Sequence, residues 1–345
     1  MAEHSPQTLR FAGPGLERLE LAVTFGEDRA PQPGSPFRLR TVRLAEPWPG
    51  VEPGGVTELL QKRIVDGGRA EWAHLDGLDR EISIGLRLLR GSAAAGREYP
   101  RELTRLIGYD VDALEPFVLY LPYHGTPVAR QVRRFLLPDQ QALESGLFQA
   151  LERLASLGVT HRAISPDTVL WEQGTSRVQL VDFSSAVVSG SAAGAAAGTP
   201  WLCPADVHSG DTRVDVWSAG AVLYYAITGR RPADRDPASD AAMRSSTLQS
   251  QLARILADSV AARPDAREVL LALGRHETWP DLTALIDAPD AEFERGGAEF
   301  DGIFPPPVPV APPQPPPVAP IPVPPPGPDS GRKRRWPWSK GAPLR

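Results

Sequence analysis

The chain is poor in two residue types, and both shortages narrow its class. Its 345 residues include one cysteine, Cys203, and three lysines, of which Lys333 and Lys340 lie close to the C-terminal end. A single cysteine excludes an internal disulfide and is typical of a reducing compartment. The formal net charge of −5 excludes a general electrostatic attraction to nucleic acid, and the sequence carries no specific nucleic-acid signal.

Long hydrophobic runs are also missing. The longest apolar run, residues 214–228, is too short and too interrupted to span a bilayer. Residues 1–13 lack the positive region and apolar core of a signal peptide. These absences predict a cytoplasmic protein. The length of the chain and its 41% of apolar residues are enough for a substantial buried core.

Glycine is abundant, with 31 residues, but the spacing Gly-x-Gly-x-x-Gly does not occur in the first 60 residues. The glycines there are scattered between alternating apolar and polar segments at 19–23 and 37–42, which predict antiparallel strands joined by turns. Scattered glycines of this kind are typical of ordinary turns. We therefore assign no loop that cradles phosphate groups.

The rest of the chain is organised around residues 161–183, HRAISPDTVLWEQGTSRVQLVDF. Residues 169–171 and 178–181 are predicted to form two short strands joined by a turn that contains glycine. The second strand leads directly to Asp182 and an aromatic residue. A hairpin that ends in a carboxylate is suited to hold a metal ion over a cleft.

This stretch resembles the catalytic loop, His-Arg-Asp-Leu-x-x-x-Asn, and the metal-binding loop, Asp-Phe-Gly, of protein kinases. His161 and Arg162 match the start of the first motif, and Asp182 and Phe183 match the second. The residues that handle protons and metals in the family are changed. Its catalytic Asp, its Lys two residues later, its metal-binding Asn and its final Gly correspond here to Ala163, Ser165, Thr168 and Ser184.

The resemblance is longer and better ordered in the C-terminal half. Asp215-Val216-Trp217 is similar to a segment of the central helix in the kinase large lobe, whose Asp holds the backbone of the catalytic loop. Residues 198–206 resemble the end of the activation segment, with Asp206 in place of the final Glu that pairs with an Arg. The resemblance implies structural or regulatory roles for His161, Arg162, Phe183, Asp206, Asp215 and Arg263.

For a nucleotide site, the resemblance implies Lys62, Glu81, Leu121, Tyr123 and Asp182. Lys62 would reach the phosphates from a predicted strand at 59–65, and Glu81 would pair with it from a predicted helix at 76–90. Leu121 and Tyr123 would belong to the hinge, and Asp182 would hold magnesium. From the residues alone, Lys62 is equally well explained as a solvated strand charge, and Glu81 as a surface charge on a helix.

The fold implied is α+β and bilobal, with a small antiparallel β lobe that carries one helix and a large, mostly helical lobe. The kinase-like domain is expected at 15–275. A helix over 139–157 is expected to begin at an Asp139 N-cap and to stop at Gly158. Residues 184–206 are rich in small residues and are expected to form a mobile loop, whose serines are read as an unmodified spacer or as phosphate acceptors near Arg162.

Three segments follow this domain. Residues 276–303 are expected to pack on or near it through Phe293 and Phe300. Residues 304–330 are Pro-rich and predict a disordered, semi-extended linker. Residues 331–345 form a basic tail with two tryptophans. The Pro-rich segment and the tail are read either as docking elements for a partner protein or an anionic membrane surface, or as a plain soluble linker.

Two functions are consistent with these residues. The first is a pseudokinase, a non-catalytic or nucleotide-switched scaffold that acts through protein partners. The second is a weak ATP-dependent Ser/Thr kinase that uses Lys62, Asp182 and one metal ion. The resemblance implies ATP with magnesium as ligands, whereas the altered motifs allow a domain that binds neither. Because general-base catalysis contributes about 10²- to 10⁴-fold, the loss at Ala163 favours the first.

Overall fold

The computed structural model describes residues 6–30, 35, 37–48, 55–64, 72–189, 200–232 and 246–287. The predictions for the middle of the activation segment, for Phe293 and Phe300, for the Pro-rich segment and for the basic tail lie outside these residues. Among the helices within them, none is long and apolar enough to cross a membrane.

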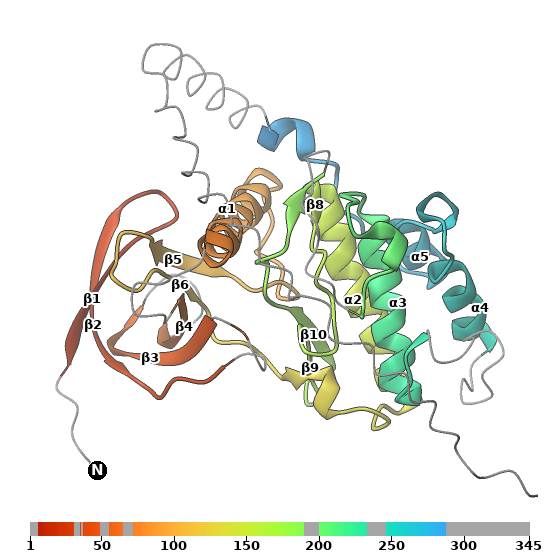
Figure 1. The fold of residues 1–345 in the computed structure, drawn as a ribbon, viewed down its shortest axis with the longest axis horizontal. Coiled ribbons are helices and arrows are strands. Elements are labelled where there is room, and N and C mark those ends of the chain that lie inside the picture. The colour runs from red at the N-terminus through yellow and green to blue at the C-terminus, as the bar shows by residue number, and fades with distance from the viewer. Residues whose placement is uncertain are drawn as a thin grey trace, which may run out of the picture. The chain divides into compact units, whose positions relative to one another are not determined.

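The N-terminal part of the chain is a closed β-barrel (Figure 1). Its strands follow one another around the barrel in the order β1-β2-β3-β4-β6-β5, and every neighbouring pair is antiparallel. Apolar side chains that alternate with polar ones along the strands fill its interior. The strands are β1 (Gln7–Ala12), β2 (Arg18–Phe25), β3 (Phe37–Trp48), β4 (Val56–Ile64), β5 (Leu106–Asp110) and β6 (Phe117–Tyr120).

Strand β1 is a finding that the sequence did not suggest, because it lies before the expected start of the domain. It pairs with β2 along its whole length and meets β5 at Ala12 and Tyr109, which closes the sheet. The close approach depends on Gly108, where an added Cβ would lie 2.7 Å from the Ala12 carbonyl oxygen. Closure leaves this small lobe without an open sheet edge.

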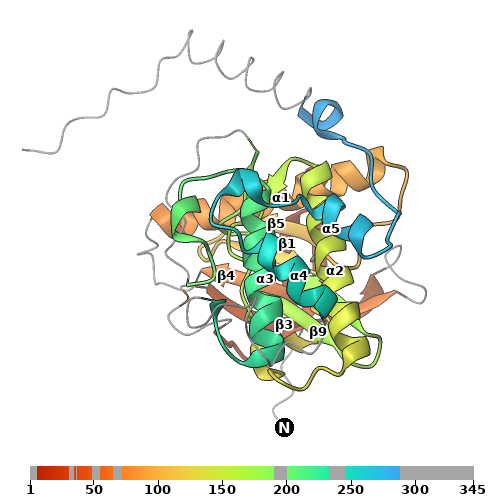
Figure 2. The same ribbon diagram turned by 90° about the vertical axis from the view of Figure 1, so that its right-hand side faces the viewer.

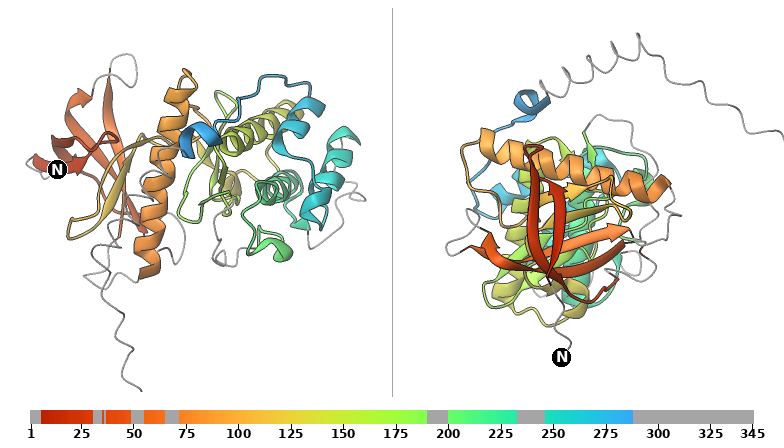
Figure 3. Two further views of the ribbon diagram at one scale, coloured as in Figure 1. Left: turned by 90° about the horizontal axis from the view of Figure 1, so that it is seen from above. Right: turned by 90° about the vertical axis from the view of Figure 1, so that its left-hand side faces the viewer.

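Helix α1 (Trp72–Ala94) is the one helix of the small lobe among the described residues, and it extends the predicted helix at both ends. Figure 3 shows it between the barrel and the large lobe. Leu78 and Ile82 on its inner face pack against Leu60, Leu106 and other barrel residues. The amphipathic stripe therefore attaches the helix to the sheet that carries Lys62.

The large lobe is mostly helical, and Figure 2 shows its helices α2, α3 and α5. These helices share the largest hydrophobic cluster among the described residues. Its described elements in chain order are β7 (Thr126–Pro127), η1 (Val128–Arg130), α2 (Leu137–Ser156), β8 (Val159–Thr160), β9 (Val169–Glu172), β10 (Arg177–Leu180), β11 (Val187–Val188), η2 (Pro204–Asp206), α3 (Arg213–Thr228), α4 (Ser246–Ile255), η5 (Val260–Ala262) and α5 (Ala266–Ala272). The predicted bilobal α+β fold is confirmed, and β9 and β10 form the predicted hairpin.

Helix α2 begins earlier than expected. Its N-cap is Leu136, not Asp139, because Pro138 is accommodated in the first turn, where no backbone N–H is needed. Asp139 instead occupies the third helical position and accepts a hydrogen bond from the Leu136 amide. The predicted stop is correct: Gly158 has a φ of 63°, a left-handed conformation that favours glycine.

Two connecting segments are more regular than their composition suggests. Within residues 184–206, β11 pairs with β8, and Asp206 is the last residue of η2. Residues 279–287 are tied to the large lobe by hydrogen bonds from the Trp279 amide to Glu152 and from the Leu282 amide to the Ser156 carbonyl. The beginning of the C-terminal extension is therefore part of the same packed unit.

Candidate functional site

A buried charge cluster joins the two lobes. Lys62 on β4 places its Nζ 2.5 Å from Glu81 Oε1 on α1 and 2.9 Å from Asp182 Oδ1, which follows β10. Lys62 and Glu81 are each only 1% exposed, which excludes the readings of both as surface charges. Arg63, on the opposite face of β4, forms ion pairs with Asp28 and Glu115 instead. Alternation along one strand thus separates the two cations.

Burial and charge together set the protonation of the cluster. Burial raises the pKa of Glu81 to about 7, while Lys62 opposes the rise. Burial also acts to raise the pKa of Asp182, but Lys62 and the Ser184 hydroxyl outweigh it and hold that pKa well below its usual range. Burial acts to lower the pKa of Lys62, and the two carboxylates reverse this to a net rise. Lys62 is therefore charged beside an ionised Asp182 at neutral pH.

Three further side chains complete the cluster, and sequence reasoning missed their parts in it. The ring of Phe37 lies over the Lys62 ammonium, with 4.3 Å between the nitrogen and the ring centroid. The Ser184 hydroxyl donates to Asp182 Oδ1 at 2.6 Å, and the Tyr120 hydroxyl donates to Glu81. Of these three residues, only Ser184 could have been suspected from the sequence, because it lies two residues after Asp182 at the position of the family's glycine. Together these groups surround Lys62 with partners from the protein itself.

The predicted hinge residues lie beside this cluster. The Leu121 amide donates to the Arg105 carbonyl at 3.0 Å, which continues the β5–β6 pairing past Tyr120. The Tyr123 ring packs against the Tyr120 ring, with 6.2 Å between centroids. Burial raises the pKa of Tyr123 well above its usual range, so this phenol is neutral. A contact of either hinge residue with nucleotide stays a prediction.

In the loop after His161, the positions that carry catalytic groups in the family are hydrogen-bonded to one another. The Thr168 hydroxyl donates to the Ala163 carbonyl at 2.9 Å and accepts a hydrogen bond from the Ser165 amide at 2.9 Å. The Ser165 hydroxyl lies 3.2 Å from the same oxygen. Both hydroxyls thus form hydrogen bonds within the loop. None of the side chains at these three positions is a carboxylate, an amide or an ammonium group.

The buried side chains that hold this loop and the end of the activation segment in place are present. They are here called the frame and are His161, Phe183, Asp206, Asp215 and Arg263. Asp215 on α3 accepts hydrogen bonds from the backbone amides of His161 at 2.5 Å and Arg162 at 2.8 Å, as the resemblance implied. The His161 ring packs on Phe183 with 4.8 Å between centroids, and its Nε2 lies 3.2 Å from the Val181 carbonyl oxygen. Burial lowers the pKa of His161 to about 4, so the ring is neutral and its Nε2–H donates to that carbonyl.

A second buried ion pair fixes the end of the activation segment. Arg263 Nη1 lies 2.5 Å from Asp206 Oδ2, and the side chains of both residues are almost fully buried. Arg263 also donates to the carbonyls of Ala257 and Asp258. The shorter Asp206 therefore reaches the arginine that a Glu would reach in the family, and the predicted pair is present.

The residues present do not fit the magnesium–nucleotide arrangement of an active kinase. Asp182 is the one carboxylate at the matching positions, and the hydroxyl of Thr168 is already engaged within the loop. Within the described ranges no group of three or more His, Cys, Asp or Glu side chains is arranged to hold a metal ion. Lys62 has its own carboxylates and an aromatic face as partners, so a phosphate would have to displace them.

Comparison with known proteins assigns the fold. Residues 128–275 match the family model of the protein kinase domain, which covers the large lobe from η1 to the end of α5. Residues 128–275, less than half of the chain, are therefore assigned to the protein kinase superfamily. Its small lobe, outside the matched residues, has the lysine–glutamate pair that the kinase resemblance implied.

Curated relatives agree at low identity. A probable myosin light chain kinase of Dictyostelium discoideum is 25% identical over 207 residues, which is 58% of this chain and 40% of the relative. The serine/threonine-protein kinase PEPKR2 of Arabidopsis thaliana is 29% identical over 140 residues, or 39% of this chain and 30% of the relative. Sperm motility kinase 2A of Mus musculus is 31% identical over 102 residues, or 28% and 20%. The chain spans less than half the length of each.

Proposed function

We propose that this kinase-superfamily protein is a pseudokinase: a non-catalytic regulatory module that acts by binding protein partners. The observation that carries the proposal is the catalytic loop closed by its own hydroxyls, with Thr168 bonded to the Ala163 carbonyl. Phosphoryl transfer needs a group that accepts the proton of the acceptor hydroxyl and ligands that hold the metal ions. The loop offers neither group.

The Lys62 cluster supports the same proposal. A lysine that pairs with nucleotide phosphates needs a free face for them, whereas Lys62 is enclosed by Glu81, Asp182 and Phe37. Nucleotide phosphates would therefore have to compete with Asp182 and Phe37 for the Lys62 ammonium, which already contacts both. The cluster is better explained as a buried connection between the lobes than as a nucleotide site.

The test is a calorimetric titration of ATP into the full chain, with and without magnesium. We expect no saturable heat up to millimolar ATP, and no difference between the wild type and Lys62→Ala or Asp182→Ala. The same samples, incubated with ATP and a general Ser/Thr acceptor such as myelin basic protein, should give no phosphorylated product by intact mass.

The alternative is a weak ATP-dependent Ser/Thr kinase that uses Lys62, Asp182 and one magnesium ion. The retained pair between Lys62 and Glu81 favours it. Magnesium-dependent binding that both alanine variants abolish, together with transfer to the acceptor, would establish this alternative. Binding of ATP without phosphoryl transfer would indicate a nucleotide-switched scaffold. It would also contradict the proposal that the surroundings of Lys62 exclude nucleotide.

The C-terminal segments enter this proposal as docking elements. The Pro-rich residues 304–330 and the basic residues 331–345, with Trp336 and Trp338, would tether the module to a protein partner or to an anionic membrane surface. A cytoplasmic location, peripheral at the membrane through this tail, is the corresponding proposal for localisation.

A further inference from the structure

An arginine-rich groove lies on a part of the domain that shares no residue with the Lys62 cluster. It consists of two adjoining cavities of about 680 and 700 Å³, which have Tyr99, Arg101 and Arg177 among their common lining residues. The first cavity extends to Leu121 and His124 behind the hinge, and the second extends along α2. The common residues make the two cavities one elongated groove.

The lining of this groove carries more positive than negative side chains, although the whole chain is acidic. Six arginines and three glutamates line it, and one of each, Arg153 and Glu102, form an ion pair with each other. Over the described part of the chain the other five arginines form no ion pair. They are Arg97, Arg101, Arg105, Arg177 and Arg275.

Two of these arginines lie near aromatic rings. The guanidinium of Arg105 is 5.5 Å from the Tyr99 ring centroid, and that of Arg97 is 5.8 Å from the Trp279 centroid. The Nε of Arg105 is buried and has no hydrogen-bond partner in the described structure. A buried donor without a partner is costly, so the protein itself leaves this guanidinium incompletely satisfied.

The backbone that presents the arginines is rigidly held. Leu180 donates to the Glu102 carbonyl and accepts from the Thr104 amide, which pins the segment after α1 onto β10. The Tyr99 hydroxyl donates to the Thr104 carbonyl at 2.7 Å, and Gln179 accepts from the His124 amide at 2.8 Å. Because the walls are ordered in advance, a ligand would not have to order them at a cost in affinity.

We propose that this groove is a docking site for an extended acidic peptide segment of a partner protein. Arginine pairs with carboxylates through two parallel hydrogen bonds, and five unpaired arginines match a run of acidic side chains. The uncharged polar residues Gln141 and Gln149 on α2 supply partners for the peptide backbone. The one lining tyrosine, Tyr99, is half-buried, its hydroxyl donates to the Thr104 carbonyl and the Arg105 guanidinium lies near its ring, which disfavours a nucleic acid that would stack its bases there.

This inference rests on the proposed function, since it names the surface through which a regulatory module would meet its partner. The two proposals nevertheless fail separately. The ATP titration tests the Lys62 cluster, whereas peptide binding tests the groove, and no residue varied in one experiment is varied in the other.

The experiment is a fluorescence anisotropy titration of the full chain against a fluorescein-labelled ten-residue peptide of alternating Glu and Ala. We expect saturable binding that weakens as sodium chloride is raised, because exposed charges are screened by salt. The double variant Arg101→Glu/Arg177→Glu should weaken binding at least about tenfold, since it replaces attraction by repulsion at two contacts.

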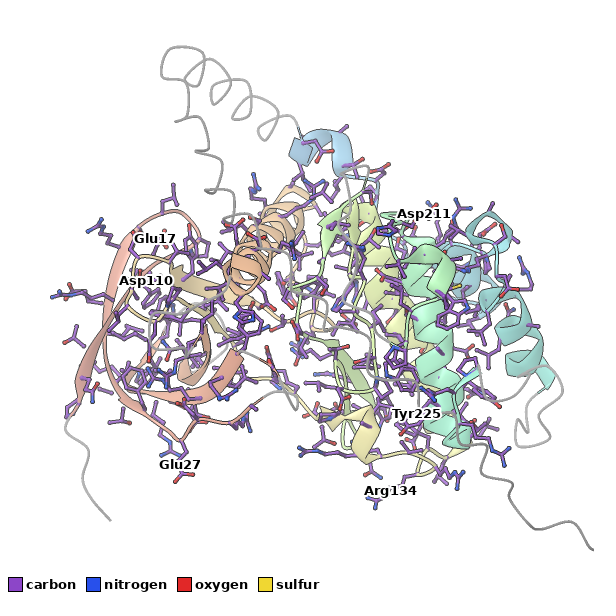
Figure 4. The ribbon with its side chains drawn as sticks, in the orientation of Figure 1. Glu17, Glu27, Asp110, Arg134, Asp211 and Tyr225 are labelled. Atoms are coloured by element: carbon purple, nitrogen blue, oxygen red, sulfur yellow. The ribbon has the colours of Figure 1, made fainter. Side chains whose placement is uncertain are left out.

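The matched control is Arg134→Glu/Arg254→Glu, which makes the same change in net charge outside the groove. Figure 4 shows Arg134 pointing away from the domain, and Arg254 is an exposed residue of α4. We expect the control variant to bind the peptide as the wild type does, and both variants to keep the wild-type circular dichroism.

Three outcomes would overturn the proposal. The first is no saturable binding to the wild type at millimolar peptide, and the second is equal weakening by the control variant. The third is that a ten-residue uridine oligonucleotide, or inorganic phosphate alone, displaces the peptide at lower concentration than an unlabelled copy does. That result would make the groove a site for nucleic acid or for small anions.

Discussion

The loop from His161 to Thr168 and the buried groups that hold it in place retain very different parts of the kinase pattern. The frame keeps its charges: Asp215 still binds the loop backbone, and Arg263 still pairs with an acid. The loop keeps none of its charged or amide groups at Ala163, Ser165 and Thr168. The fold therefore depends on charges that the domain satisfies internally, whereas the lost groups would have acted on a substrate.

The reason for this difference is energetic. A buried charge without its partner costs several kcal/mol, so loss of one member of a frame pair endangers the fold. A catalytic carboxylate at a half-exposed position contributes little to stability, so its replacement by Ala163 costs the fold little. The residues that stabilise a kinase-like fold are therefore different from those that carry out kinase chemistry.

The largest loss of stability is expected when Arg263 is removed from the frame. We expect Arg263→Ala to lower the free energy of unfolding by about 3–5 kcal/mol, because Asp206 would remain buried without a cation. Urea unfolding followed by circular dichroism measures the change. The matched control is Arg213→Ala, which removes a half-exposed pair with Asp211 near the start of α3 (Figure 4) and should cost about 0.2–1 kcal/mol. Equal losses of unfolding free energy in the two variants would show that the buried pair matters no more to the fold than the half-exposed pair.

The second prediction concerns Lys62, which joins frame and site. We expect Lys62→Met to cost about 3 kcal/mol at pH 9 and clearly less at pH 6. The folded-state pKa of Glu81 is about 7, against 4.5 for the ordinary group, so wild-type stability falls as pH rises between these values. Without Lys62 that pKa rises further, and the fall continues above pH 7. At pH 6 Glu81 is mostly protonated, so the variant then loses chiefly the partner of Asp182.

Unfolding of this variant and of the wild type at the two pH values measures the difference. Arg43→Met is the control, because Arg43 and Glu58 form an exposed pair on the barrel, and its removal should have a small and pH-independent effect. A loss at Lys62 that is the same at both pH values would mean that Glu81 does not titrate in this range.

The smallest expected effect lies in the loop itself. Thr168→Val removes a buried hydroxyl that donates to Ala163 and accepts from the Ser165 amide, and should cost about 1–2 kcal/mol. Ala163→Asp, which restores the family's carboxylate, should change stability by less than about 0.5 kcal/mol. Parallel urea titrations measure both. If Ala163→Asp proved the more damaging of the two, the loop would be closed by packing at Ala163 and not by the Thr168 hydroxyl.

Much of the fold could be predicted because its elements depend on local patterns. The apolar stripe of α1, the alternation along β4 and the glycine after α2 each specify local geometry within a few residues. The start of α2 was misplaced, since Asp139 can cap the helix from its third position as well as from the N-cap. Strand β1 was missed because it is short and is held by long-range contacts: pairing with β2 and, across nearly 100 residues of chain, with β5, and burial of Leu9 and Phe11 in the barrel.

The sequence by itself determined the superfamily, the missing catalytic groups and the frame residues, because motif spacing and residue type carry that information. Only the tertiary structure decided that Lys62 is enclosed, since Phe37, Tyr120 and Asp182 come from three separate strands or strand ends. It also decided that the arginines of the groove lie together. Residues far apart in the chain share a charge environment only after folding, and burial then makes each unpaired charge costly.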